Sequence, residues 1–155
     1  MLKKLLLCLI VFGVPVCSAQ TSSVAGEWHG GWTNPAGFVY TADLTLNTGP
    51  ACKTCTATGD GSIQGQIVWT LRKVAANASA GYAAKVGLTS TEFVRGEMRG
   101  DSFLVFNGYR KDDPSGIIGL DRYRLALSDD GKVIGGITYD NGPWTGQFFV
   151  VRVLP

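Results

Sequence analysis

Charged side chains are densest in one segment of the chain, residues 108–124. Its acidic members carry the oxygen ligands that calcium prefers, and they are Asp112, Asp113 and Asp121. Its arginines have the donors needed to hold an anion, and they are Arg110 and Arg122. However, the spacing matches no recognised cation loop, Asp before Pro-Ser-Gly is common in turns, and Arg and Asp on neighbouring strands form ordinary cross-strand pairs. We therefore expect structural roles here, and we predict no metal site and no cofactor.

Catalysis has little support in the sequence. His29 is the only histidine, so a Ser-His-Asp triad could be built in just one way, and no Gly-x-Ser-x-Gly motif is present. Glu92 and Glu97 fall on one expected strand with opposite side-chain directions, which is the wrong arrangement for paired carboxylates. Acid and base residues can still meet from distant strands. We nevertheless predict no catalytic residue, and we expect His29 on the solvent side of its strand.

The first residues have the pattern of a secretory signal peptide. Lys3 and Lys4 precede a continuous apolar run, and small residues follow at Ser18 and Ala19. The apolar run is shorter than the about 20 residues that a membrane-spanning helix needs. The sequence therefore predicts cleavage after residue 19, a single domain over residues 20–155, and an exported protein that is periplasmic or extracellular, with no stable membrane insertion.

Removal of this segment changes the charge and the cysteine content. The chain has 14 Lys and Arg against 12 Asp and Glu, so loss of two lysines lowers the formal charge from +2 to zero. The remaining charges are scattered with both signs interleaved, whereas a nucleic-acid-binding protein shows clustered Lys and Arg. We predict no nucleic-acid partner.

Two cysteines remain after cleavage, in a Cys-Lys-Thr-Cys run within a polar, glycine-rich stretch. Zinc would need two further ligands, and a c-type haem would need His where Thr56 stands. A thioredoxin-like redox motif should open a helix, but turn-forming residues follow. In an oxidising compartment, we predict a local disulfide between Cys52 and Cys55.

Most of the mature chain has the pattern of β-strands. Turn-forming residues such as Asn34-Pro35-Ala36-Gly37 and Asp129-Asp130-Gly131 separate segments of alternating apolar and polar residues. The expected strands are 25–33, 38–46, 62–73, 90–99, 102–110, 120–128, 132–139 and 145–154. No segment shows helical periodicity over a useful length. The count and the tight turns predict an all-β fold, an eight-stranded antiparallel up-and-down barrel.

Alternation within the strands predicts which side chains face inward. Ile63, Ile67, Trp69 and Leu71 share one face of their strand. An outer-membrane barrel also has an even number of strands and a signal peptide, but there the apolar residues would face lipid. The end of this chain, where Phe148 to Val151 run together without alternation, instead favours a barrel with a buried final strand.

One pair of residues carries a family resemblance. Gly26-Glu27-Trp28 opens the first expected strand, and Arg152 lies in the last. This arrangement resembles the signature of the calycin superfamily, which includes lipocalins, avidins and small periplasmic inhibitors of serralysin-type metalloproteases. The resemblance implies that Trp28 plugs one end of the barrel. It also implies that Arg152 packs over Trp28 and bonds to nearby main-chain carbonyls, so that both residues are structural.

Two functions remain open. In the first, the barrel mouth holds a small apolar ligand, because a barrel of about eight strands has room for one. The aromatic residues expected to contact it are Trp32, Tyr40, Trp69, Phe106, Tyr109 and Tyr123. In the second, the interior is filled and the surface binds a protein partner, as the resemblance to periplasmic protease inhibitors allows. The sequence predicts a non-enzymatic binding module with the small ligand preferred, and a cavity is the observation that separates the two functions.

Overall fold

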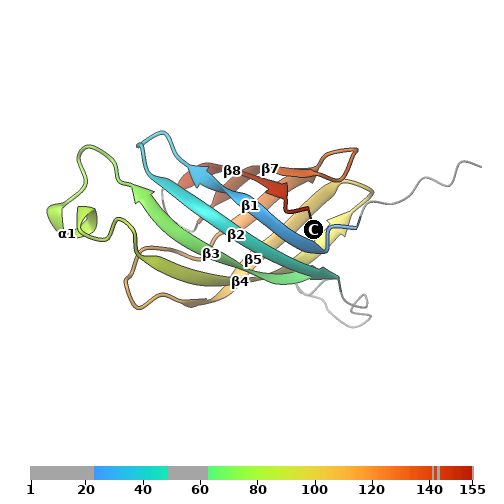
Figure 1. Cartoon of the computed structure of the whole chain (residues 1–155), viewed down its shortest axis with the longest axis horizontal. Helices are drawn as coiled ribbons and strands as arrows, with labels where there is room; N and C mark the ends of the chain where they lie inside the picture. The colour runs from blue at the N-terminus through green and yellow to red at the C-terminus, as the bar shows by residue number, and fades with distance from the viewer. Residues whose placement is uncertain (1–22, 49–62, 141, 143, 155) are drawn as a thin grey trace, which may run out of the picture.

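The computed structural model describes residues 23–48, 63–140, 142 and 144–154. These residues form eight strands and one short helix (Figure 1). In chain order the elements are β1 (Gly26–Thr33), β2 (Val39–Thr48), β3 (Ile63–Lys73), α1 (Ala80–Ala83), β4 (Thr89–Arg99), β5 (Phe103–Asp112), β6 (Arg122–Leu127), β7 (Val133–Tyr139) and β8 (Thr145–Arg152). In this described part of the chain, no helix has the length and apolar character to cross a membrane.

The strands close into a barrel. Each strand pairs antiparallel with the next, and β8 returns to pair with β1. The closing seam places Trp28 opposite Arg152 and Thr33 opposite Gln147. The predicted all-β, eight-stranded antiparallel barrel is therefore confirmed, and it is consistent with a calycin-like fold. The expected signal peptide and the Cys52–Cys55 disulfide lie outside the described residues.

The apolar faces point inward, as the alternation predicted. On β3 the side chains of Ile63, Ile67, Trp69 and Leu71 are all buried. The strand β6 alternates between buried and exposed positions along its whole length. Successive side chains on a strand point to opposite faces. Every second residue of each strand therefore faces inward, and these side chains fill the barrel interior.

Strand ends differ from the prediction by up to two residues, and one helix was not expected. The strand β6 begins at Arg122, two residues later than expected, because the preceding residues cross one end of the barrel. The helix α1 was not expected, since four residues are too few for helical periodicity. Its N-terminus is capped by Ser79, whose hydroxyl accepts a hydrogen bond from the amide of Tyr82 at 3.2 Å.

The barrel has two different ends. At one end, here called the mouth, lie the connections after β1, β3, β5 and β7, including α1 (Figure 1). At the other, here called the base, lie the start of β1, the β4–β5 and β6–β7 turns, and the end of β8. The two ends bury different side chains, and the mouth contains a cavity.

Candidate functional site

The base is sealed by Trp28 and Arg152. Trp28 is 1% exposed, and the guanidinium carbon of Arg152 lies 4.1 Å from the centre of a Trp28 ring. Arg152 Nε donates to the carbonyl of Gly131 at 2.9 Å, and Nη1 donates to that of Ala25 at 2.8 Å. Trp28 Nε1 donates to the carbonyl of Val24 at 3.1 Å. The packing and the carbonyl bonds implied by the family resemblance are both present, and they leave these side chains no donor group directed at a ligand in the interior.

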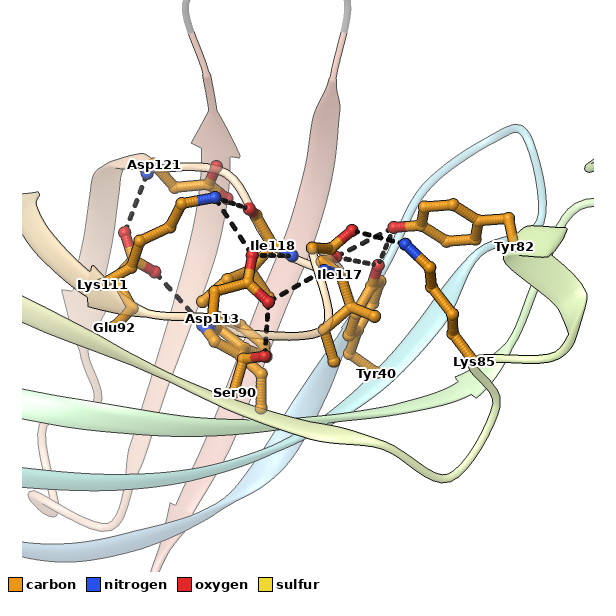
Figure 2. A network of polar contacts seen from close by, with 12 residues as sticks. Tyr40, Tyr82, Lys85, Ser90, Glu92, Lys111, Asp113, Ile117, Ile118 and Asp121 are labelled. Atoms are coloured by element: carbon orange, nitrogen blue, oxygen red, sulfur yellow. Dashed lines mark hydrogen bonds and ion pairs between the residues drawn. The ribbon is translucent and has the colours of Figure 1, made fainter.

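The mouth is crossed by the β5–β6 connection, residues 113–121, here called the mouth loop. Asp113 organises it by accepting hydrogen bonds from Ser90 Oγ at 2.6 Å, from the amide of Ile117 at 2.9 Å and from Lys111 Nζ at 3.0 Å (Figure 2). Burial opposes ionisation, but these donors outweigh it and lower the pKa of Asp113 to about 2. Asp113 is therefore a charged anchor of the loop rather than a calcium ligand.

Two tyrosines hold the mouth loop against the barrel wall. Tyr40, from β2, donates its hydroxyl to the carbonyl of Ile117 at 2.7 Å, and Tyr82, from α1, donates to the same oxygen at 2.9 Å (Figure 2). Burial raises the pKa of Tyr40, so its hydroxyl stays protonated and remains a donor. Ile117 itself is 2% exposed and packs into the core. The mouth loop is thus built into the barrel end.

Between the mouth loop and the strands lies a cavity of about 240 Å³. One part of its wall is aromatic, formed by Trp32, Tyr40, Trp69, Tyr82 and Trp144. The other part consists of three carboxylates, Glu92, Asp121 and Asp140, together with residues 116–119 of the mouth loop.

Glu92 is the most deeply buried carboxylate of the wall, at 1% exposure. Its Oε2 accepts hydrogen bonds from Tyr123 Oη at 2.5 Å and from Trp69 Nε1 at 3.1 Å, and its Oε1 accepts from the amide of Asp121 at 2.8 Å. Burial raises the pKa of Glu92 to about 7, although these three donors partly offset the effect. The carboxyl therefore titrates near neutral pH, inside the barrel.

A glycine makes room for Glu92. A Cβ at Gly108, on the neighbouring strand β5, would stand 1.8 Å from Glu92 Oε1. Any larger residue at this position would displace the carboxylate, because its Cβ would overlap the Glu92 side chain. Gly108 thus allows a carboxylate to lie flat against the inner surface of β5.

Asp121 and Asp140 form a second acidic group at the outer part of the cavity. Thr138 Oγ1 donates to Asp121 Oδ2 at 3.1 Å and accepts from Trp32 Nε1 at 2.7 Å. Asp140 Oδ1 accepts the amides of Gly142 at 2.7 Å and Trp144 at 3.2 Å, which fixes the β7–β8 turn. Burial, together with the neighbouring Asp140 charge, raises the pKa of Asp121 to about 6.

The structure brings three of the six predicted ligand-binding aromatics to this cavity. Trp32, Tyr40 and Trp69 line it. Phe106 and Tyr123 are buried in the core and stack on each other with ring centres 4.5 Å apart. Tyr123 reaches the site only through its hydroxyl, which holds Glu92.

Tyr109 lies on the outer surface, where it is 47% exposed, with the guanidinium of Arg95 at 4.8 Å from its ring centre. Strand alternation from the inward-facing Phe106 already directs Tyr109, three residues on, to the outer face. Phe93 pairs with Arg110 and Val94 with Gly108, so Tyr109 is an extra residue with no partner on β4 in this register.

The other candidate polar residues do not meet in a site. The guanidinium of Arg110 lies 3.6 Å from the ring centre of Phe93 on the outside of the barrel. His29 Nδ1 lies 2.6 Å from Asp43 Oδ1, with both side chains more than half exposed. Across the described residues, no group of three or more His, Cys, Asp and Glu side chains is arranged to hold a metal ion.

Sequence reasoning missed the acidic half of the cavity. Glu92 was considered only as a partner for Glu97, and Asp121 only as part of a cation loop. A usable signal was present, since Ser90, Glu92 and Val94 alternate with the partly exposed Thr91 and Phe93, and this places Glu92 on the inner face. Tyr82, Asp140 and Trp144 lie in connections, where strand alternation gives no information.

A second hollow, of about 460 Å³, lies outside the barrel beside the β1–β2 turn and the edges of β7 and β8. Its wall has no charged and no aromatic side chain and is formed largely by Thr, Asn, Pro, Gly and Gln. Although larger, it offers little to recognise a ligand, so the cavity in the mouth is the better candidate site. No family model, no curated protein and no solved structure matches this chain.

Proposed function

We propose that this chain is a non-enzymatic, exported binding module that holds a small ligand with an apolar or aromatic body in the mouth of the barrel. The observation that carries this proposal is the cavity of about 240 Å³ between the aromatic wall and the mouth loop. Small-molecule sites are concave and aromatic-lined, with a few polar groups that fix orientation.

The size of the cavity limits the ligand. An engineered apolar cavity of about 150 Å³ binds benzene, so a cavity of about 240 Å³ fits one ring with a short substituent. Longer chains such as fatty acids do not fit, because below the cavity the interior is filled by stacked Phe106 and Tyr123 and by Phe148.

Binding accounts for the site better than nucleophilic catalysis. A carboxyl with a raised pKa in a cavity can serve as a general acid or base. Among the described residues that line this cavity, however, there is no Ser, Thr, Cys, His or Lys to act as a nucleophile. Glu92 also has three hydrogen-bond donors, which fix it as part of the wall.

A cavity-filling variant tests the proposal. A Cβ at Gly119 would stand 3.8 Å from Asp121 Oδ1 and 3.9 Å from Asp140 Oδ2, both in the cavity wall. Gly119→Leu therefore fills the mouth without a close clash. Calorimetric titration of single-ring compounds with neutral, positive and negative substituents is expected to give saturable micromolar binding to the native chain, and Gly119→Leu is expected to abolish it.

Gly81→Leu is the matched control, because a Cβ at Gly81 would have no neighbour within 4 Å. It adds the same side chain on the exposed helix α1 and should leave binding intact. If no compound in the panel binds the native chain, or if Gly119→Leu binds as well as Gly81→Leu, the proposed function is wrong.

A protein partner remains the second candidate, because the outer face of β7 and β8 is unusually apolar. Ile137, Phe149 and Val151 are 53%, 55% and 43% exposed. Val133 pairs with Val151 and Gly135 with Phe149, so this apolar surface is continuous across the two strands. Contiguous apolar surface of this kind marks interaction sites. A periplasmic protease inhibitor is one form that such a function could take.

Substitution on that face separates the two candidates. If the barrel acts through a protein partner, Phe149→Lys with Ile137→Lys should abolish stoichiometric capture of the partner from periplasmic extract. The same double variant should leave ligand titration at the mouth unchanged, since both side chains point away from the cavity.

A further inference from the structure

We infer that the mouth cavity selects an organic cation: an amine or a quaternary ammonium carried on a body about the size of one aromatic ring. This inference rests on the proposed function and adds the charge of the ligand. It follows from three features of the cavity, which are the sign of its charges, two carboxylate oxygens beside Gly119 that no described donor occupies, and the use of its indole N–H groups.

Every charged side chain in the described wall of the cavity is acidic, namely Glu92, Asp121 and Asp140. Two lysines lie nearby, but both bind the mouth loop. Lys85 Nζ donates to the carbonyl of Gly116 at 3.3 Å, and Lys111 Nζ donates to the carbonyl of Ile118 and to Asp113 (Figure 2). Neither lysine is part of the cavity wall, so an anion would meet no cation there.

Two carboxylate oxygens are left for a ligand. Asp121 uses Oδ2 for Thr138, and Asp140 uses Oδ1 for the β7–β8 turn. The remaining oxygens, Asp121 Oδ1 and Asp140 Oδ2, both lie beside Gly119, 3.8 and 3.9 Å from the position that a Cβ of this glycine would take. No donor from the described residues occupies either oxygen. An ammonium group bound beside Gly119 would have these two carboxylates as charge-assisted acceptors.

The aromatic wall uses two of its three indole N–H groups within the protein. The N–H groups of Trp32 and Trp69 are spent on Thr138 and Glu92. Trp144 stacks on Trp32 with ring centres 6.2 Å apart and an angle of 22° between the planes. The face of an indole ring is electron-rich and attracts a cation, most strongly where water is excluded. Rings and carboxylates together therefore suit an organic cation better than a bare metal ion, which would need more oxygen ligands.

The electrostatics of the site support the same ligand. Burial and the nearby charge of Asp140 raise the pKa of Asp121 to about 6, which means that its ionised form lacks a compensating cation in the described structure. A bound ammonium would supply that cation. Protonation of Asp121 removes the attraction, so affinity for a cation should fall as the pH drops through about 6.

Three probes with the same ring and different charge test the inference: 2-phenylethylamine, 2-phenylethanol and 3-phenylpropanoate. We expect calorimetric titration at pH 7.5 to show the amine binding about tenfold more tightly than the alcohol, and the propanoate binding most weakly. Asp121→Asn and Asp140→Asn should reduce the amine to the level of the alcohol while leaving the alcohol unchanged. Asp43→Asn, on the exposed outer face of β2, is the matched control and should change none of the three.

The pH profile of the native chain is the second measurement, and it needs no variant to fold. Amine affinity should fall between pH 7.5 and pH 5, whereas alcohol affinity should stay constant. Equal affinities for all three probes would overturn the cationic ligand but leave the proposed binding function standing. Saturable binding of calcium with no binding of the amine would also overturn it. If none of the three probes binds, the inference is wrong. The titration of the wider panel of single-ring compounds against the native chain and Gly119→Leu would then test the proposed function separately.

Discussion

The two ends of the barrel bury polar groups in opposite ways. At the base, the guanidinium of Arg152 covers Trp28, and each of its nitrogens donates to a backbone carbonyl. At the mouth, Glu92 is 1% exposed and carries a pKa raised to about 7. The base contains a guanidinium whose nitrogens all donate hydrogen bonds, whereas the mouth contains carboxyl groups whose ionisation is disfavoured by burial.

This difference separates structure from function. A buried ionisable group that lowers stability is retained where it has another use, because a well-packed apolar residue would stabilise the fold more. By this criterion Trp28 and Arg152 serve the fold. We propose that Glu92, Asp121 and Asp140 instead serve ligand binding.

The base should show the largest effect of any single substitution. Trp28→Ala removes a side chain that is 1% exposed and that supports Arg152, and it should lower the free energy of unfolding by about 3–5 kcal/mol. Chemical denaturation measures it. Phe149→Ala, at 55% exposure on β8, is the control and should cost far less. An unchanged unfolding midpoint for both Trp28→Ala and Arg152→Ala would mean that the base does not hold the barrel closed.

The buried carboxyl groups of the mouth should make the free energy of unfolding depend on pH. The pKa of Glu92 rises from 4.5 to about 7 on folding, so the folded protein binds this proton more tightly than the unfolded chain. The resulting stability is fully present below pH 4.5 and is lost as the pH rises to about 7, a change of about 3 kcal/mol. Asp121, whose pKa rises to about 6, adds a loss of the same sign.

Denaturant unfolding at pH 4.5 and pH 7.5 measures this loss. Glu92→Gln cannot titrate, so it should remove about 3 kcal/mol of the difference between the two pH values, whatever its stability at one pH. Glu97→Gln, on the same strand but directed outward beside Arg99, is the matched control and should keep the native profile. A stability that rises steadily from pH 4.5 to 7.5 would contradict the burial of an uncompensated carboxyl at the mouth.

The mouth loop should depend on Asp113. Asp113→Ala leaves the amides of Ile117 and Ile118, together with Ser90 Oγ, without their acceptor. The expected loss is about 1–3 kcal/mol, concentrated at this end of the barrel. Hydrogen exchange should therefore accelerate at Ile117 and Ile118 but not at Trp28. Asp112→Ala, the exposed neighbour, should leave all three amides unchanged.

The sequence predicted features that depend on neighbouring residues better than features that depend on contacts between residues far apart in the chain. The barrel could be predicted because alternation and turn residues are local, and the interior faces of β3 and β6 needed nothing else. Trp32, Tyr40 and Trp69 followed from the same rule. Glu92 and Asp121 did not, because their contact depends on β4 pairing with β5 and on the path of the mouth loop beyond it. Tyr109 was wrongly expected at the ligand, because alternation from the buried Phe106 places it on the outer face.

The smallest expected effect is that of the predicted disulfide between Cys52 and Cys55, which lie between β2 and β3 in the sequence. Two residues separate the cysteines, so the bridge closes a very short loop and should contribute about 2 kcal/mol or less, since the constraint on the unfolded chain grows with loop length. Intact-mass measurement of freshly exported protein tests the bond and the signal cleavage together. We expect a chain that begins at Gln20, lacks the mass of two hydrogen atoms, and gains two alkyl groups only after reduction.

Reduction should lower the unfolding midpoint slightly and leave ligand titration at the mouth unchanged. Two thiols that react without reduction would remove the disulfide, and a reduced protein that loses ligand affinity would show that the disulfide and the mouth are not independent.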